Sequence, residues 1–249
     1  MKLSVVIPMY NEEEIIESTI KTLDGALSAG FEQGEYEMIF VSDGSVDNTL
    51  GKAESLRGEI GSLRVIGYTP NRGKGCAVRT GMLEANGDFV LFTDCDLAYG
   101  AEIIKTFYDE FAGSDCDIVI GSRALKGGGY DGYTFLRKIM SKTYLWVISV
   151  FADFKLSDSQ CGIKGFSNEA AKRIFGECES ERFEFDLEAL MIAQRLGCKI
   201  TEIPVRIINH RESKVNPIRD SLRILKQLRI IKKREKQKKR ATANQSDIK

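Results

Sequence analysis

The sequence predicts an α/β protein with a mostly parallel central sheet and helices on both faces. Short runs of apolar and β-branched residues alternate with segments whose apolar residues recur at the spacing of one helix face. Strands buried on both sides have this continuous apolar character, and parallel strands need long, usually helical, crossovers. The 249 residues, 43% of them hydrophobic and 29% charged, suffice for one large domain or two small ones.

The first half alternates regularly. We expect strands at residues 3–8, 36–41, 63–68, 89–94 and 118–122, with helices at 12–27, from about 48, at 73–85 and at 101–111. Ser45 or Asp47 can cap the second of these helices. After residue 125 the pattern changes. There we expect helices at 135–151, 168–175 and 186–196, short strands at 161–166 and 199–207, a basic amphipathic helix from 217 to about 233, and then a disordered polar tail.

The distribution of charge and of cysteines limits the class of protein that the sequence can encode. The formal net charge is +0, but lysine and arginine crowd into residues 214–249, so the body before them is acidic. The cysteines are dispersed without a Cys-x-x-Cys pair, which favours reduced thiols in a cytoplasmic protein over a disulfide framework or a zinc site. The apolar run at 3–7 is too short for a signal peptide, and no stretch approaches the ~20 residues of a membrane span.

Two acidic residues stand at the end of the predicted strand at 89–94. Asp94 and Asp96 are two positions apart, so they would share a face if the strand continued. Open α/β sheets bind ligands at the carboxyl ends of their strands. Neighbouring carboxylates repel unless a cation lies between them, and oxygen ligands suit Mg²⁺ or Mn²⁺. The pair therefore predicts a divalent metal site. The alternative is that both residues only cap the next helix or face water.

Polar residues follow the other strands of the first half and should meet the aspartates in one crevice. Gly73-Lys74-Gly75 leads into a helix N-terminus, which favours phosphate, although the segment lacks the P-loop pattern. Asp43 could accept hydrogen bonds from a base or ribose, or serve only the turn in which it lies.

Arg137 and Ser141 are four residues apart on a predicted helix, and with Arg123 they could bind a phosphate monoester. Alternatively, Arg137 only solvates its helix.

Several of these stretches together resemble glycosyltransferase family 2, which has the Rossmann-like GT-A fold. The matching stretches are residues 4–12, 41–49, 71–75 and 94–96. The resemblance implies that Asp94 and Asp96 hold the metal that bridges a nucleotide-sugar diphosphate, and that Asp43 holds the base. Ser42 departs from the family, which often has a second aspartate there. The remaining residues implied on the nucleotide side are Pro8, Tyr10, Asn11, Glu12, Gly73, Lys74, Arg79, Cys95 and Gln160.

The second half resembles the polyprenyl-phosphate glycosyltransferases, in particular dolichyl-phosphate β-glucosyltransferases. The matching stretches are residues 121–123, 158–164, 185–188, 202–205 and 213–214, with Arg137 and Ser141. The resemblance implies a nucleotide-sugar half at 1–125, an acceptor half at 126–214 and a helix with a tail at 215–249. Arg123, Arg137 and Ser141 would bind the acceptor phosphate. Arg211, Ser213 and Lys214 would close over the diphosphate. Asp186 and Glu188 would order that loop or position the sugar, or be structural.

The expected activity is an inverting, metal-dependent transfer of a hexose onto a polyprenyl or dolichyl monophosphate. Glucose from UDP-glucose is the first choice of donor, and mannose from GDP-mannose the second. A phosphate monoester has a second pKa of about 6, so it is already a nucleophile at neutral pH and needs no general base. The alternatives are transfer to a sugar hydroxyl with Asp186 as base, a nucleotidyltransferase, or a non-catalytic nucleotide-binding membrane scaffold.

A lipid acceptor implies contact with a membrane. The predicted helix at 135–151 has an apolar face that includes Trp146, although a core helix would look similar. The basic segment from 219 to 234 interleaves apolar residues, which is typical of a helix on an anionic membrane surface. A solvated tail or a nucleic-acid contact is the alternative. We expect a peripheral protein on the cytoplasmic face of a membrane, with no nucleic-acid partner.

Overall fold

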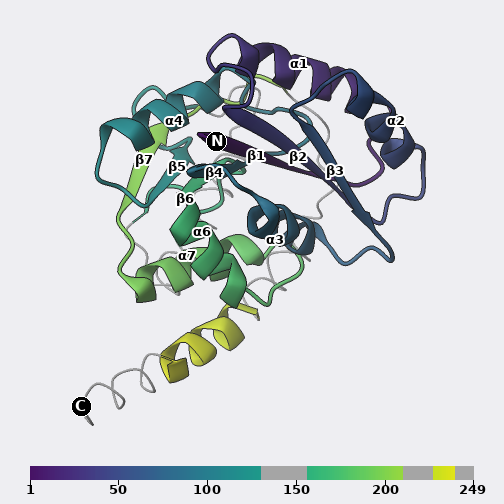
Figure 1. Ribbon diagram of the computed structural model, residues 1–249. Helices are drawn as coiled ribbons and strands as arrows, with labels where there is room; N and C mark the ends of the chain where they lie inside the picture. The colour runs from purple at the N-terminus through teal and green to yellow at the C-terminus, as the bar shows by residue number, and fades with distance from the viewer. Residues whose placement is uncertain (130–155, 210–226, 239–249) are drawn as a thin grey trace.

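The computed structural model describes residues 1–129, 156–209 and 227–238. Its strands form one seven-stranded sheet in the order β3-β2-β1-β4-β6-β5-β7 (Figure 1). All strand pairs are parallel except the two that β6 makes with β4 and β5. The predicted α/β architecture is confirmed. The strands are β1 Leu3–Met9, β2 Tyr36–Asp43, β3 Leu63–Tyr68, β4 Phe89–Phe92, β5 Ile118–Ser122, β6 Lys164–Ser167 and β7 Ile200–Pro204.

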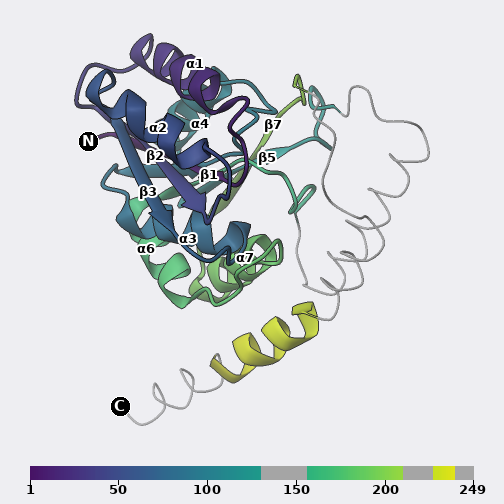
Figure 2. The same ribbon diagram turned by 90° about the vertical axis from the view of Figure 1, so that its right-hand side faces the viewer.

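Helices cover both faces of the sheet, as the sequence predicts. The helices α1, α2 and α4 lie on one face, and α3, α6 and α7 lie on the other (Figures 1 and 2). Val5 and Ile7 of β1 point into the first layer, whereas Val6 between them packs in the second. This explains why the strands read as continuous apolar runs. The bounds are α1 Ile16–Ser28, α2 Thr49–Ser55, the short 3₁₀ helix η1 Leu56–Gly58, α3 Lys74–Glu84, α4 Ile103–Gly113, α6 Asn168–Glu177 and α7 Phe185–Leu196.

The strand order reverses direction at β1. The chain leaves β1 towards β2 and β3 on one side, and β4 returns to pair with β1 on the other. Connections that diverge in this way leave a crevice outside the carboxyl ends of the strands, where ligands of open α/β sheets bind. The polar residues that follow β1 and β4 lie at this edge.

Two boundaries in this region differ from the sequence prediction. The strand β4 ends at Phe92, opposite Lys164, instead of continuing to Asp94. The chain then turns, because the backbone N–H of Leu97 bonds the carbonyl of Asp94 at 3.1 Å. Asp94 and Asp96 therefore share a turn and not a strand face. The strand β6 begins at Lys164 instead of residue 161.

The sequence predicts a disordered tail after about residue 233, but residues 234–238 are helical and continue the helix that the structure describes from residue 227. The part of this helix after residue 233, yellow in Figure 1, makes ion pairs with helices α6 and α7. Glu235 pairs with Arg195 at 2.6 Å, and Lys238 pairs with Glu177 at 2.9 Å. The body thus supplies partners that composition alone does not show. The helix expected at 135–151 and the start of the basic helix at 217–226 lie outside the described residues.

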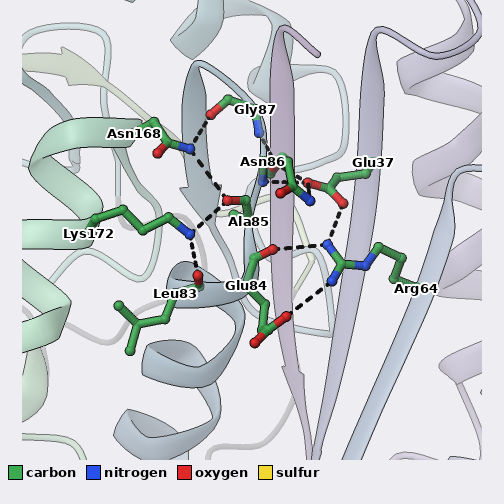
Figure 3. Close-up of polar contacts among 10 residues, drawn as sticks. Glu37, Arg64, Leu83, Glu84, Ala85, Asn86, Gly87, Asn168 and Lys172 are labelled. Carbon is green, nitrogen blue, oxygen red and sulfur yellow. Dashed lines mark hydrogen bonds and ion pairs between the residues drawn. The ribbon is translucent and has the colours of Figure 1, made fainter.

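A polar cluster at the opposite edge of the sheet fixes the end of α3 (Figure 3). Lys172 of α6 donates to the carbonyl of Ala85 at 2.8 Å. Arg64 donates to the carbonyl of Glu84 at 3.0 Å and to the buried Glu37 carboxylate at 2.7 Å. The backbone N–H of Asn86 also bonds Glu37, at 2.8 Å. Cations that satisfy the last carbonyls of a helix stabilise its C-terminus. The N-terminus of α3, at the crevice, is thereby anchored from its far end.

Candidate active site

The turn that carries the two aspartates is held from two sides. The hydroxyl of Thr19 in α1 donates to the carbonyl of Cys95 at 2.9 Å. The side-chain amide of Asn209 donates to the carbonyl of Leu97 at 3.0 Å. Leu97 itself has a φ of 46°, a left-handed conformation that is uncommon for a branched residue. These contacts fix the backbone around Asp94 and Asp96 before any ligand binds.

The Lys74 ammonium reaches into this turn from the first residue of α3. Its Nζ lies 2.5 Å from Asp94 Oδ1. Burial alone would lower the pKa of Lys74, but the carboxylates of Asp94 and Asp186 outweigh it and raise that pKa. Burial and the nearby Asp94 carboxylate raise the pKa of Asp96. The site therefore concentrates negative charge, and a protein cation already binds one of its carboxylates.

This donor set fits a hard divalent cation. Asp94 and Asp96 offer carboxylate oxygens at the crevice, and the ammonium of Lys74 stands where positive charge is favourable. In the described part of the chain, no group of three histidine, cysteine or acidic residues is arranged to hold a metal. A cation here would therefore need further oxygen ligands from water or a bound diphosphate, which is the usual situation for Mg²⁺.

The carboxylate of Asp43 is bonded to the end of β3 and to the turn that follows it. Its carboxylate accepts from the Tyr68 hydroxyl at 2.8 Å, from the Asn71 amide at 2.8 Å and from the backbone N–H of Arg72 at 2.9 Å. The N–H of Gly73 adds a further bond at 2.9 Å. Burial and the neighbouring Cys76 and Asp43 side chains raise the pKa of Tyr68, which keeps its hydroxyl a donor. The geometry therefore favours the turn role for Asp43 that the sequence left open.

The glycines at the start of α3 admit another stretch of backbone. A Cβ on Gly73 would lie 2.5 Å from the carbonyl oxygen of Glu181, and one on Gly75 would lie 2.7 Å from that of Ser180. The N–H of Cys76 bonds the Glu181 carbonyl at 3.0 Å. These glycines thus serve close packing, and the N–H groups of Gly73 and Cys76 are already used by the protein.

The loop after β1 is tied to the start of α2. Asn11 has a φ of 53°, and its Oδ1 accepts from the N–H of Val46 at 2.9 Å. The N–H of Glu12 donates to Thr49 at 2.7 Å. Tyr10 is exposed at the crevice edge, whereas Pro8 is buried within β1. Of these residues Tyr10 has the side chain best exposed for a ligand.

Arg123 follows β5 and is held by a buried carboxylate. Its Nε lies 2.6 Å from Asp158 Oδ2, and its terminal nitrogen lies 2.9 Å from Oδ1. Asp158 is fully buried, and the Arg123 side chain is 14% exposed. Burial alone would lower the pKa of Arg123, but the hydrogen bonds to Asp158 hold it well above its ordinary value. The guanidinium is therefore permanently charged and oriented.

A short loop joins the Arg123 side of the crevice to Asp94. A Cβ on Gly162 would lie 2.5 Å from Asp94 Oδ2, so this glycine lets the 158–162 loop approach the aspartate. The N–H of Gly162 bonds the hydroxyl of the buried Tyr99 at 3.2 Å. Tyr99 and Arg123 are close enough to interact electrostatically. Asp94 and Arg123 thus face the same edge of the sheet.

Other candidates fall in different places. The Nε2 of Gln160, in the same loop, is buried without a hydrogen-bond partner in the described part of the chain. Arg79 acts electrostatically on Cys178, near the 227–238 helix. Glu188 is buried in α7 and pairs with Arg234. Residues Arg137, Ser141, Arg211, Ser213 and Lys214 lie outside the described residues.

Three contributors were not on the list of candidates drawn from the sequence. Lys164 is fully buried. Its Nζ donates to the Asp186 carboxylate at 2.9 Å and to the carbonyl of Cys161 at 2.6 Å. Asp158 holds Arg123, and Tyr99 holds Gly162. Asp158 and Lys164 end the stretch 158–164 that carries part of the family resemblance, which could have identified them. Tyr99 has no comparable signal.

The fold and the aspartate pair define a class. A mostly parallel sheet with an acidic turn after its central strand is the GT-A architecture of nucleotide-sugar-dependent glycosyltransferases. The structure of glucosyl-3-phosphoglycerate synthase from Mycobacterium tuberculosis in complex with UDP matches with a TM-score of 0.67. That match covers 92% of this chain and 79% of the other at 20% sequence identity, so it establishes the fold.

Sequence comparison places the chain more narrowly. Residues 4–175 match Glycosyl transferase family 2, and the chain belongs to this family of enzymes. A dolichyl-phosphate beta-glucosyltransferase from Drosophila melanogaster is 36% identical, over 87% of this chain and 70% of the relative. A dolichol-phosphate mannosyltransferase from Pyrococcus furiosus is 33% identical, over 82% of this chain and 56% of the relative. The expected family, and the expected resemblance to dolichyl-phosphate glucosyltransferases, are confirmed.

Proposed function

We propose that the protein transfers a hexose from a nucleotide sugar to a polyprenyl or dolichyl monophosphate, with inversion at the anomeric carbon. The observation that carries the proposal is the shared edge of Asp94 and Arg123, joined through Gly162 and Tyr99. An anionic donor and an anionic acceptor must meet there. The carboxylate pair suits the donor diphosphate through a divalent cation bound between them, and the fixed guanidinium suits the acceptor phosphate directly. The names of the Drosophila and Pyrococcus relatives support a lipid phosphate acceptor.

On the donor side we assign the metal to Asp94 and Asp96. When bound, Mg²⁺ or Mn²⁺ would stabilise negative charge on the departing diphosphate. Related structures described as complexes with UDP and Mn²⁺ support this choice. Lys74 can release Asp94 to the cation and turn its ammonium to a phosphate oxygen. Tyr10, Gln160 and the backbone of Cys95 remain our proposed contacts to the nucleotide.

On the acceptor side Arg123 orients the phosphate monoester, with Arg137 and Ser141 proposed as its partners. The second pKa of the acceptor phosphate monoester is about 6, which leaves that phosphate largely dianionic at neutral pH, so no protein base has to remove a proton. An acceptor oxygen forms the bond to the anomeric carbon while the bond from that carbon to the diphosphate breaks on the opposite face. Asp158 keeps the guanidinium in place through both hydrogen bonds.

The surface of the 227–238 helix supports a membrane contact. Arg229, Lys232, Lys233 and Lys236 are exposed, and Ile230 is 51% exposed among them. Basic residues near an anionic surface contribute about 1 kcal/mol each. Leu228 and Ile231, expected on the membrane side, are instead buried. Within the described ranges no helix is long and apolar enough to cross a bilayer. We therefore propose that the protein binds a membrane surface peripherally. Vesicle flotation tests this, and we expect the protein to float with phosphatidylserine vesicles at low salt but not with phosphatidylcholine vesicles.

Donor choice is tested by assaying the full chain with Mn²⁺, dolichyl phosphate and either labelled UDP-glucose or labelled GDP-mannose. We expect glucosyl lipid and free UDP, with the mannose donor at least about tenfold slower, which corresponds to ~1.4 kcal/mol. Predominant mannosyl lipid would reassign the sugar. Release of pyrophosphate would indicate a nucleotidyltransferase. Full turnover by Asp94→Ala with metal present would overturn the mechanism.

A further inference from the structure

The carboxylate of Glu188 connects the 227–238 helix, called here the C-terminal helix, to the backbone at residues 179–180 beside the site. Glu188 is fully buried in α7. Its Oε2 accepts from the N–H of Ser180 at 2.6 Å and from that of Glu179 at 3.1 Å. Its other oxygen pairs with Arg234, which also contacts Glu179 Oε2 at 2.5 Å. A buried carboxylate needs such compensation, so the three groups hold one another in place.

The segment at 179–182 in turn rests directly on the start of α3. The Glu181 carbonyl accepts from the N–H of Cys76 at 3.0 Å, and Arg72 Nε bonds the Glu181 carboxylate at 2.9 Å. Gly73 and Gly75 leave no room for even a methyl group between the two stretches. Tight backbone contact of this kind transmits displacement, because packed interiors have little slack.

Lys74 lies between these two glycines and donates to Asp94 at 2.5 Å. A shift of the 179–182 segment would therefore move the first turn of α3 and with it the ammonium. The far end of α3 is fixed by Lys172 and Arg64. The helix can thus respond mainly at the end that faces the site.

We propose that Glu188 and Arg234 are positioning residues for the nucleotide-diphosphate end of the site, acting through the 179–182 segment on Lys74. The assignment rests on the proposed function in placing the diphosphate beside Lys74. It gives the C-terminal helix a role in nucleotide affinity in addition to the proposed membrane contact. Glu188 is fully buried and acts in this arrangement through the backbone N–H groups of Glu179 and Ser180.

The test uses the full chain with Arg234→Gln, Arg234→Lys and a matched control, Arg173→Gln. Arg173 makes an exposed ion pair with Glu169 on α6 at 3.4 Å, and among the described residues it makes no hydrogen bond or ion pair with the 179–182 segment. Hydrogen exchange is followed at the amides of Cys76, Glu179 and Ser180. Binding of UDP in Mn²⁺ is measured by calorimetry. Both readouts are independent of the transfer assay.

We expect Arg234→Gln to speed exchange at all three amides and to weaken UDP binding by about fivefold to tenfold. Arg234→Lys should recover part of both, because an ammonium keeps the charge but not the fork that reaches two carboxylates. Arg173→Gln should match the wild type. Faster exchange at Glu179 and Ser180, with exchange at Cys76 and UDP affinity unchanged, would overturn the inference.

Failure of the proposed function is visible separately. A chain that binds UDP but does not glycosylate a lipid phosphate refutes the acceptor assignment and leaves the inference supported by a weakened Arg234→Gln complex. If the wild type binds no UDP, the nucleotide site itself fails. Exchange at Cys76 then decides the mechanical link, with an unchanged rate in Arg234→Gln counting against it.

Discussion

The Lys74 ammonium lies 2.5 Å from Asp94 Oδ1 and joins the first turn of α3 to the turn after β4. The two residues are brought together by α3 packing across β1 and β4. The contact neutralises one carboxylate of a site that also contains Asp96 and lies within electrostatic reach of Asp186. The ammonium on Oδ1 would repel a divalent cation bound to the same carboxylate, so we expect Lys74 to compete with the proposed metal in the absence of nucleotide.

Replacing Lys74 should separate metal binding from turnover. Lys74→Gln removes the competing charge, so we expect Mn²⁺ binding without nucleotide to tighten by about tenfold, equivalent to ~1.4 kcal/mol. Transfer should nevertheless fall, because the diphosphate loses a proposed partner. Titration of Mn²⁺ by calorimetry and a transfer assay measure the two effects. Lys105→Gln, at an exposed pair with Asp109, serves as the control. Weaker Mn²⁺ binding in Lys74→Gln would contradict the competition.

Adding one methyl group at the start of α3 should be costly. Gly75→Ala forces a Cβ within 2.7 Å of two backbone carbonyls, and we expect a loss of about 1–3 kcal/mol in the free energy of unfolding. Gly25, inside α1, has nothing within 4 Å of an added Cβ. Gly25→Ala should therefore gain about 0.5–1 kcal/mol. Urea unfolding measures the free energy of unfolding of both variants. Equal stabilities would contradict the close packing of the 179–182 backbone against the start of α3.

The Arg123–Asp158 pair should prove structural as well as functional. Arg123→Ala leaves Asp158 buried without its partner, which we expect to cost about 3–5 kcal/mol. Arg123→Lys keeps the charge but loses the bidentate geometry, so it should fold and show a raised KM for the lipid phosphate. Urea unfolding and acceptor titration distinguish the two variants. A lysine variant with unchanged acceptor KM would remove Arg123 from the acceptor site.

Glu37 predicts a pH dependence of stability at the edge away from the site. Burial alone would raise the pKa of Glu37, but hydrogen bonds from Ser4, Arg64 and the Asn86 N–H prevail and lower it. A carboxyl whose pKa falls on folding stabilises the native state above its unfolded pKa of about 4.3 and loses that contribution as pH falls through the folded value.

The stability difference between wild type and Glu37→Gln should therefore be constant from pH 6 to 7 and shrink below about pH 4. Urea unfolding at several pH values measures this difference. A difference that grows on acidification would contradict the network drawn in Figure 3.

Much of the fold could be predicted because its signals are local. The apolar runs at β1, β2 and β4 identify strands buried on both faces, and the acidic turn after β4 marks the crevice. The antiparallel direction of β6 carried no local signal, since it depends on how the chain returns after β5. The ordered residues after 233 depend on partners in α6 and α7 that are far away in the sequence.

The residues of the candidate site could be named from the sequence, but the contacts among them could not. Gly73-Lys74-Gly75 has the composition of a phosphate-binding start of a helix, yet its glycines admit the backbone at Ser180 and Glu181. Both uses require the same absence of side chains, so spacing does not separate them. Asp43 likewise has the residue type of a base contact, while the structure gives it four donors from the last residue of β3 and the turn after it.

The most direct test of the central proposal compares dolichyl phosphate with dolichol as acceptor for labelled UDP-glucose in Mn²⁺. If Arg123 orients a phosphate monoester opposite the Asp94 site, label will enter lipid only when the phosphate is present. Transfer to dolichol, or to a sugar hydroxyl at a comparable rate, would contradict the account.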